Sequence, residues 1–288
     1  MDELNTRNLQ IIQRVTNEAR TEVKFTSLWS WFHMEYGIGQ KNVNQLKLTV
    51  KDHDNLRAIV KQTTGIDLLN PLPSGSRLEV AKSISNEKLC SENPNRHHVL
   101  LNSPNGLLTL NGFEIPLLLG SSYRCDWRTL QSEFNSVEKI IVVENLQAFD
   151  YIKMAKLPIE LKKSAWIIYR GHNESNRAVS DLLNKLPKTC EIIGFTDYDP
   201  AGIEILLTSI PKITSCLLPE LSEDLFKQGI GTEPIFQKQQ QIIDRFSQRE
   251  LPKIINDYWQ ALLKHRVCLS QELLLSRNRL LHQISLFK

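Results

Sequence analysis

The chain has 288 residues, of which 41% are hydrophobic and 23% are charged, with a formal net charge of +3. This composition is typical of a folded globular protein and excludes a disordered chain, and the apolar runs are too short for a transmembrane segment. A charge of +3 is too small to indicate by itself that the protein binds nucleic acid.

The five cysteines are scattered, and no two of them form a C-x-x-C pair. The sequence therefore indicates neither a zinc site nor a disulfide framework, and the odd count fits a reducing compartment. The first ten residues, MDELNTRNLQ, are acidic and polar where a secretory signal would be basic and then apolar. We therefore expect a cytoplasmic protein with no membrane partner.

Residues 1–117 predict an N-terminal α+β domain. Apolar positions at helical spacing predict helices over 4–20 and 25–36, and the alternating run LKLTV at 46–50 predicts a strand. A further helix is expected between that strand and Gly65. This order suits a winged-helix fold, which commonly docks on DNA, and it suits a packing or partner-binding module equally well.

A connector and a hairpin region are expected at the end of this domain. Residues 70–97 contain prolines and a polar stretch without periodicity, which predicts a connector. Two Asn-Gly pairs, at 105–106 and 111–112, then separate three short apolar runs, and Asn-Gly is the preferred pair for a two-residue turn. We expect a small antiparallel meander there, and a second domain over 118–288.

From residue 139 the pattern changes to short, continuous apolar runs separated by helical stretches. These runs lie at 139–143, 165–169, 191–195 and 213–218. Continuous apolar runs are typical of parallel strands that are buried on both faces. The sequence therefore predicts an α/β fold with a mostly parallel four-stranded sheet flanked by helices, followed by a helical C-terminal extension beyond residue 220.

Acidic residues follow two of these strands directly. Glu144 comes after the first strand, and Asp197 and Asp199 come after the third. Ligands of open parallel sheets lie at the carboxyl ends of the strands, so these carboxylates are expected to converge. Because close carboxylates repel unless a cation neutralises them, and because hard oxygen ligands suit Mg²⁺, we expect all three to be metal ligands and catalytic residues.

Two other interpretations of the D-Y-D-P-A-G segment compete with this one. Asp199 followed by a proline also fits the N-cap and first turn of a helix, with Gly202 as a close-packing residue. An EF-hand loop is excluded, because Ala201 stands where that loop needs an oxygen ligand and Thr208 stands where it needs a glutamate.

The segments IVVEN at 141–145 and FTDYDPAG at 195–202 resemble the Toprim signature, a glutamate at a strand end and a later D-x-D. The form E-N with D-x-D-P-A-G is most similar to the branch that contains the A subunit of topoisomerase VI and JetD, the nuclease of Wadjet-type, SMC-like anti-plasmid systems. The match covers residues 138–217. The pair Gln271-Glu272 also resembles a Q-E pair near the end of JetD-like chains.

The resemblance implies a Rossmann-like Toprim domain. Asp197 and Asp199 would hold Mg²⁺, for which Mn²⁺ can substitute, and Glu144 would share a second ion or act as general acid/base. It implies double-stranded plasmid DNA as substrate, a homodimer, and activation by an SMC-like ATPase complex in a prokaryotic cytoplasm, on the nucleoid or a plasmid.

Three further residues at the same sheet end are candidate phosphate contacts: Asn145, Arg170 and His172. A turn residue explains the first equally well, and a solvated loop explains the other two.

The nature of the reaction depends on the nucleophile. A topoisomerase-like transesterase needs a tyrosine before the Toprim segments, and only Tyr36 and Tyr123 precede them. Tyr36 lacks a neighbouring arginine, and Tyr123 lies almost against the first strand of the sheet. Water is therefore the expected nucleophile, which makes the protein a DNA endonuclease. A non-catalytic DNA-binding or assembly subunit remains an alternative, although an unused carboxylate cluster would cost stability.

Overall fold

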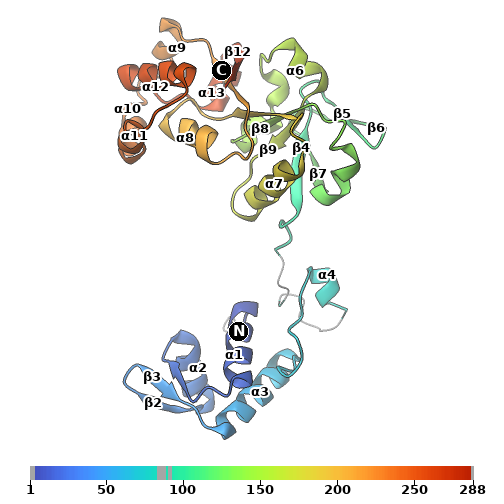
Figure 1. Cartoon of the computed structure of the whole chain (residues 1–288), viewed down its shortest axis with the longest axis vertical. Coiled ribbons are helices and arrows are strands. Elements are labelled where there is room, and N and C mark those ends of the chain that lie inside the picture. Colours follow the sequence, from blue (N-terminus) through green and yellow to red (C-terminus); the bar gives the residue numbers. More distant parts are fainter. Residues whose placement is uncertain (1–3, 83–88, 90–92, 287–288) are drawn as a thin grey trace. The chain divides into compact units, whose positions relative to one another are not determined.

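The computed structural model describes residues 4–82, 89 and 93–286, and the chain divides into two compact units, residues 1–94 and 95–288 (Figure 1). Each unit has its own buried apolar cluster. The boundary lies at 94/95 rather than at the predicted 117/118, because strand β4 (His98–Asn102) belongs to the large sheet of the second unit. Within the described ranges, no helix is long and apolar enough to cross a membrane.

The first unit combines helices with a small antiparallel sheet in the order β1-β3-β2. Its elements are α1 (Thr6–Asn17), β1 (Glu22–Lys24), α2 (Ser27–Tyr36), β2 (Gln40–Asn42), β3 (Gln45–Lys47), α3 (Val50–Thr64) and α4 (Arg77–Val80). The predicted helices and strand occur in the expected order, but β1 and β2 were not predicted and the strand expected over 46–50 ends earlier. Thr49 and Asp52 form a capping box, so Val50 begins α3 instead of ending the strand.

The second unit is a mixed α/β structure around a seven-stranded sheet, with strand order β12-β11-β10-β8-β9-β4-β7. The four predicted parallel strands lie together in it, as β8 (Lys139–Val143), β9 (Trp166–Tyr169), β10 (Glu191–Phe195) and β11 (Ser215–Pro219). Three antiparallel strands extend the sheet on both sides, namely β4, β7 (Tyr123–Asp126) and β12 (Leu281–Ser285). Each of the four parallel strands therefore has a hydrogen-bonded strand on both sides.

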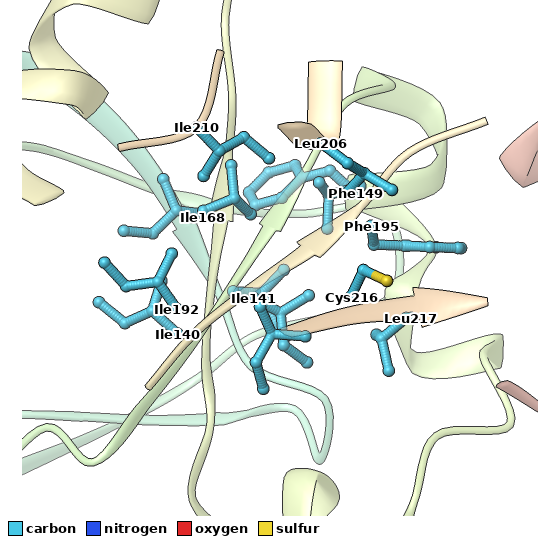
Figure 2. Close-up of a cluster of buried hydrophobic side chains, with 14 of the residues drawn as sticks. Ile140, Ile141, Phe149, Ile168, Ile192, Phe195, Leu206, Ile210, Cys216 and Leu217 are labelled. Carbon is cyan, nitrogen blue, oxygen red and sulfur yellow. The ribbon is translucent and has the colours of Figure 1, made fainter. Parts of the chain in front are cut away.

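Helices surround this sheet (Figure 1). In the sequence, the segments that connect the parallel strands contain α5 (Leu146–Asp150), α6 (Ile159–Ser164), α7 (Glu174–Lys185), α8 (Pro200–Thr208) and a short 3-10 helix at Ile152–Met154. A second 3-10 helix, Trp127–Glu133, precedes β8. Figure 2 shows how Phe149 of α5 and Leu206 of α8 pack with apolar side chains of the four parallel strands. The burial of whole strands explains their continuous apolar sequences.

Two predictions about the second unit need correction. Only the second Asn-Gly pair forms a hairpin, between β5 (Leu107–Leu110) and β6 (Phe113–Pro116), where Asn111 and Gly112 have φ of 51° and 74°. The expected meander is not formed, because β4 pairs with β7 and β9.

The C-terminal extension is helical as predicted, with α9 (Glu223–Lys227), α10 (Glu233–Lys238), α11 (Gln240–Phe246), α12 (Lys253–His265) and α13 (Gln271–Ser276). The chain then returns to the sheet as β12, a strand that the sequence does not predict.

Candidate functional site

The carboxyl ends of β8 and β10 place Glu144 beside Asp197. The two strands pair in parallel up to the last residue of each, and the Glu144 N–H donates to the carbonyl of Phe195 at 3.0 Å. One carboxylate oxygen of Glu144, Oε2, accepts the backbone N–H of Asp197 at 3.2 Å. Two of the predicted acids are therefore in direct contact through the turn that follows β10.

A glutamine from the C-terminal extension joins both loops. Gln271 is fully buried at the first position of α13. Its side-chain Oε1 accepts the N–H of Asn145 at 2.7 Å, and its Nε2 donates to the carbonyl of Phe195 at 2.9 Å. Its backbone N–H donates to Asp197 Oδ1 at 2.8 Å. Gln271 thus holds the ends of the two acid-bearing strands at a fixed spacing.

Asp199, the third predicted acid, caps helix α8. Its Oδ1 accepts the N–H of Gly202 at 2.7 Å, and its Oδ2 accepts a hydrogen bond from Nε2 of Gln239 at 2.7 Å. The other end of the Gln239 amide accepts the N–H of Ala201 at 2.9 Å. Asp199 is only 8% exposed, so both of its carboxylate oxygens are used inside the protein. This is the capping role that the proline after it also suggests.

Gly202 is required by the close approach of α8 to the acidic turn. A Cβ at this position would lie 1.9 Å from the carbonyl oxygen of Asp197. The hydroxyl of Thr196 also donates to the Gly202 carbonyl, at 3.1 Å. The glycine of D-Y-D-P-A-G therefore has a steric cause at the turn that presents Asp197.

Burial dominates the electrostatics of this cluster. Desolvation, together with the charges of the neighbouring acids Glu144, Asp199 and Glu272, raises the pKa of Asp197 to about 7, against the lowering effect of the Gln271 N–H. Desolvation likewise raises the pKa of Glu144. The cluster contains more negative charge than its protein partners neutralise.

Arg170 and His172 supply positive charge on the Glu144 side of the cluster. Arg170 follows β9, and its N–H donates to the Val143 carbonyl at 2.8 Å. Both side chains lower the pKa of Glu144 through their charge, which opposes the effect of burial. The Nε of Arg170 is buried and has no hydrogen-bond partner within the described part of the chain. His172 is exposed and makes an edge contact with Tyr169.

Asn145 is the N-cap of α5. Its side-chain oxygen accepts the N–H of Gln147 at 2.8 Å. The turn role that the sequence left open for this residue is therefore present.

Comparison with protein families matches most of the second unit. The family model described as a domain of unknown function, DUF7281, matches residues 96–283, which is more than half of the chain. The chain belongs to the DUF7281 family. The match includes the edge strand β7, runs past Gln271 and ends within the other edge strand, β12, whereas the first unit lies outside it. Comparisons with curated proteins and with solved structures give no match.

The DUF7281 domain offers two carboxylate oxygens for a cation. Glu144 Oε1 and Asp197 Oδ2 accept no hydrogen bond from the described residues, and neither is among the buried polar atoms that lack a partner. Mg²⁺ is commonly held by one or two carboxylates, with water and substrate phosphate as the other ligands. Glu144 and Asp197 therefore offer the type and number of protein oxygens that Mg²⁺ commonly takes.

Asp199 was expected to be a third metal ligand, and the structure gives its carboxylate other partners. Over the described ranges, no group of three or more His, Cys, Asp or Glu side chains is arranged to hold a metal ion. Asp199 does not contribute to such a group because its two carboxylate oxygens accept hydrogen bonds from Gly202 and Gln239. Sequence reasoning missed Gln239 altogether, and it noted Gln271 only through a resemblance.

Proposed function

We propose that the DUF7281 domain of this chain is a Mg²⁺-dependent endonuclease that hydrolyses the phosphodiester backbone of DNA. One observation carries the proposal: Glu144 and Asp197 lie half-buried at the carboxyl ends of adjacent parallel strands, with raised pKa values and one uncommitted oxygen each. Burying acids without a counter-charge costs free energy, and a divalent cation would remove this cost. Gln271 supports the proposal because it fixes the spacing of the two acids.

In this reaction, different residues of the site would bind the metal ion, the proton and the phosphate. Glu144 and Asp197 would hold Mg²⁺, or Mn²⁺ in its place, and the bound ion would neutralise charge on the phosphate and lower the pKa of an attacking water. In the alternative in which Glu144 does not hold the ion, a protonated Glu144 would donate its proton to the leaving oxygen. Asp199 would act through the turn that it caps. Arg170, with an unpartnered buried Nε, would bind the scissile phosphate, assisted by His172.

The biological setting is part of the proposal. The Toprim resemblance, with E-N after one parallel strand and D-x-D-P-A-G after the strand beside it, supports a JetD-like nuclease. On that basis the substrate would be double-stranded plasmid DNA in a prokaryotic cytoplasm. A second copy of the chain and an SMC-like ATPase complex would be the partners. The first unit, with helices and a β2–β3 hairpin, would be a DNA-docking winged helix.

A second candidate function is a non-catalytic DNA-binding or assembly subunit. The engagement of both Asp199 oxygens favours it, because a metal site of three carboxylates would require that residue to give up the Gln239 contact. A topoisomerase-like transesterase is the less favoured alternative. Tyr198, which lies between the two aspartates, is buried and donates its hydroxyl hydrogen to the Tyr258 carbonyl, so it is not available as a nucleophile.

Cleavage of supercoiled plasmid by the full chain tests the proposal. With Mg²⁺ or Mn²⁺ the wild type should nick or linearise the plasmid, and EDTA should prevent this. Glu144→Gln should lower the rate by roughly 100-fold or more, the size of a typical general acid/base contribution. Glu160→Gln, at an exposed position on α6, is the matched control and should keep the wild-type rate.

Three other results would contradict the proposal of a metal-dependent nuclease at this site. Undiminished cleavage by Glu144→Gln would refute the assignment of the site. A covalent tyrosyl-DNA adduct would establish transesterification. No cleavage with either ion, together with no metal-dependent rise in melting temperature, would favour the non-catalytic subunit.

A further inference from the structure

A basic groove lies on the first unit, between α1 and the segment that runs from β1 into α2. Its volume is about 520 Å³. The charged side chains that line it are Arg7, Arg14, Arg20, Glu22 and Lys24. Four cations and a single acid therefore line the groove, and one of the cations, Arg20, is paired with Glu18 outside the lining at 2.6 Å. The groove concentrates positive charge that the composition alone does not reveal.

Three of these cations are available to a ligand. Arg7, Arg14 and Lys24 are exposed, and none of them forms an ion pair within the described residues. The single acid of the groove, Glu22, lies 3.8 Å from Lys47, which is outside the groove lining. The acid is therefore partly neutralised from another direction, so it does little to reduce the positive potential.

The spacing of the cations suits a row of anions better than a single one. Arg7 and Arg14 are seven residues apart on α1, which places them about 10 Å apart along the helix axis. This is about the axial length of three base pairs. On the other wall, Thr26 and Ser27 line the groove at the start of α2, where Thr26 makes no side-chain capping hydrogen bond. The first N–H groups of that helix add further positive potential.

We propose that this groove binds the phosphate backbone of double-stranded DNA and anchors the chain on it without reading base sequence. Arginine suits this task because its guanidinium group matches phosphate geometry, and backbone contacts position a protein without specifying sequence. An acidic protein surface is the competing ligand, but a groove with cations spaced along one helix fits a linear polyanion better. The choice of DNA among polyanions rests on the proposed function.

Fluorescence anisotropy with a labelled DNA duplex of about 30 base pairs tests this inference on the full chain. The measurement is made in EDTA, so that neither a metal ion nor hydrolysis contributes. The double variant Arg7→Gln/Arg14→Gln should bind roughly tenfold or more weakly at 0.1 M salt. The slope of log affinity against log salt should become shallower by about 1.8, because two phosphate contacts are lost.

The matched control is Lys51→Gln/Lys82→Gln, which removes two exposed cations of the same unit that do not line the groove. It should keep both the wild-type affinity and the wild-type slope. Lys24→Glu, on the opposite wall, provides a second variant in case the double variant does not fold, as judged by circular dichroism. It should also weaken binding.

Equal losses in the groove and control variants would overturn the inference, because they would indicate general charge attraction. Wild-type affinity in the groove variants would overturn it as well, and so would binding to poly-glutamate but not to DNA. A chain that binds through the groove yet never cleaves would support this inference while refuting the nuclease proposal, so the two can fail separately.

Discussion

Replacing Asp197 by asparagine should stabilise the metal-free protein at neutral and alkaline pH. The pKa of Asp197 is raised to about 7 in the folded chain, from an ordinary value of 3.8. The folded state therefore binds this proton more tightly than the unfolded state does. Stability is highest when the group is protonated, and it falls as the pH rises from about 4 to about 7.

The size of the effect follows from the shift. At 1.36 kcal/mol per pKa unit, a shift of about three units corresponds to about 4 kcal/mol as an upper limit above pH 7. Asparagine removes the charge, and its Oδ1 can still accept the Gln271 N–H. We expect Asp197→Asn to gain about 2–4 kcal/mol at pH 8, or about 5–15 °C in melting temperature. At pH 4 the gain should nearly vanish.

Thermal unfolding in EDTA at pH 4, 6 and 8 measures this directly. Asp257→Asn, at an exposed position of the same unit, is the matched control and should change stability by less than about 0.5 kcal/mol at each pH. A destabilised Asp197→Asn at pH 8, or a gain that does not depend on pH, would refute the electrostatic account. Mg²⁺ at about 100 times its dissociation constant should stabilise the wild type by about 2.7 kcal/mol and the variant by much less.

Three substitutions test the contacts around the acids by urea denaturation. Gln271→Leu should lower the free energy of unfolding by about 2–4 kcal/mol, because it removes two buried hydrogen bonds and leaves the N–H of Asn145 without a partner. The control Glu272→Gln should lower it by less than about 1 kcal/mol, and equal effects would contradict the bridging role of Gln271. Gly202→Ala should cost about 2 kcal/mol or more, since its Cβ would meet a backbone carbonyl at 1.9 Å, and a neutral result would mean that α8 can shift freely. Gln239→Leu should cost about 1–3 kcal/mol and Gln240→Leu, at the exposed neighbour, about 0.5 kcal/mol or less; similar values would argue against the clamp on Asp199.

The central strands were predictable because their burial on both faces leaves a continuous apolar signature. The edge strands carry no comparable signal. Strand β12 has the sequence LHQIS, in which polar and apolar residues mix, and it pairs with β11 from far along the chain. The Asn-Gly pair at 105–106 has the composition of a hairpin turn, yet the strand before it finds partners elsewhere. The partners of β12 and β4 are set by pairing with strands far away in the sequence, which the local sequence cannot predict.

In the candidate site, too, features with a local sequence signal were predictable and long-range contacts were not. Strand ends locate Glu144 and Asp197 correctly beside one another, because parallel strands present their carboxyl ends on one edge. The proline after Asp199 signalled a helix cap, and the structure has that cap. No local pattern could reveal the two glutamines that contact the aspartates. The side chain of Gln239 donates to Asp199 from 40 residues further along the chain, and the backbone N–H of Gln271 donates to Asp197 from 74 residues further along.

The position of Gln271 also has a consequence for how the protein is made. A ribosome synthesises Glu144 and Asp197 well before it reaches Gln271, and β12 comes later still. Until α13 has emerged, the N–H groups of Asn145 and of residue 271 cannot make their contacts with the amide and the aspartate. The acidic pair therefore cannot reach its final arrangement before α13 has been synthesised and has docked on the ends of β8 and β10.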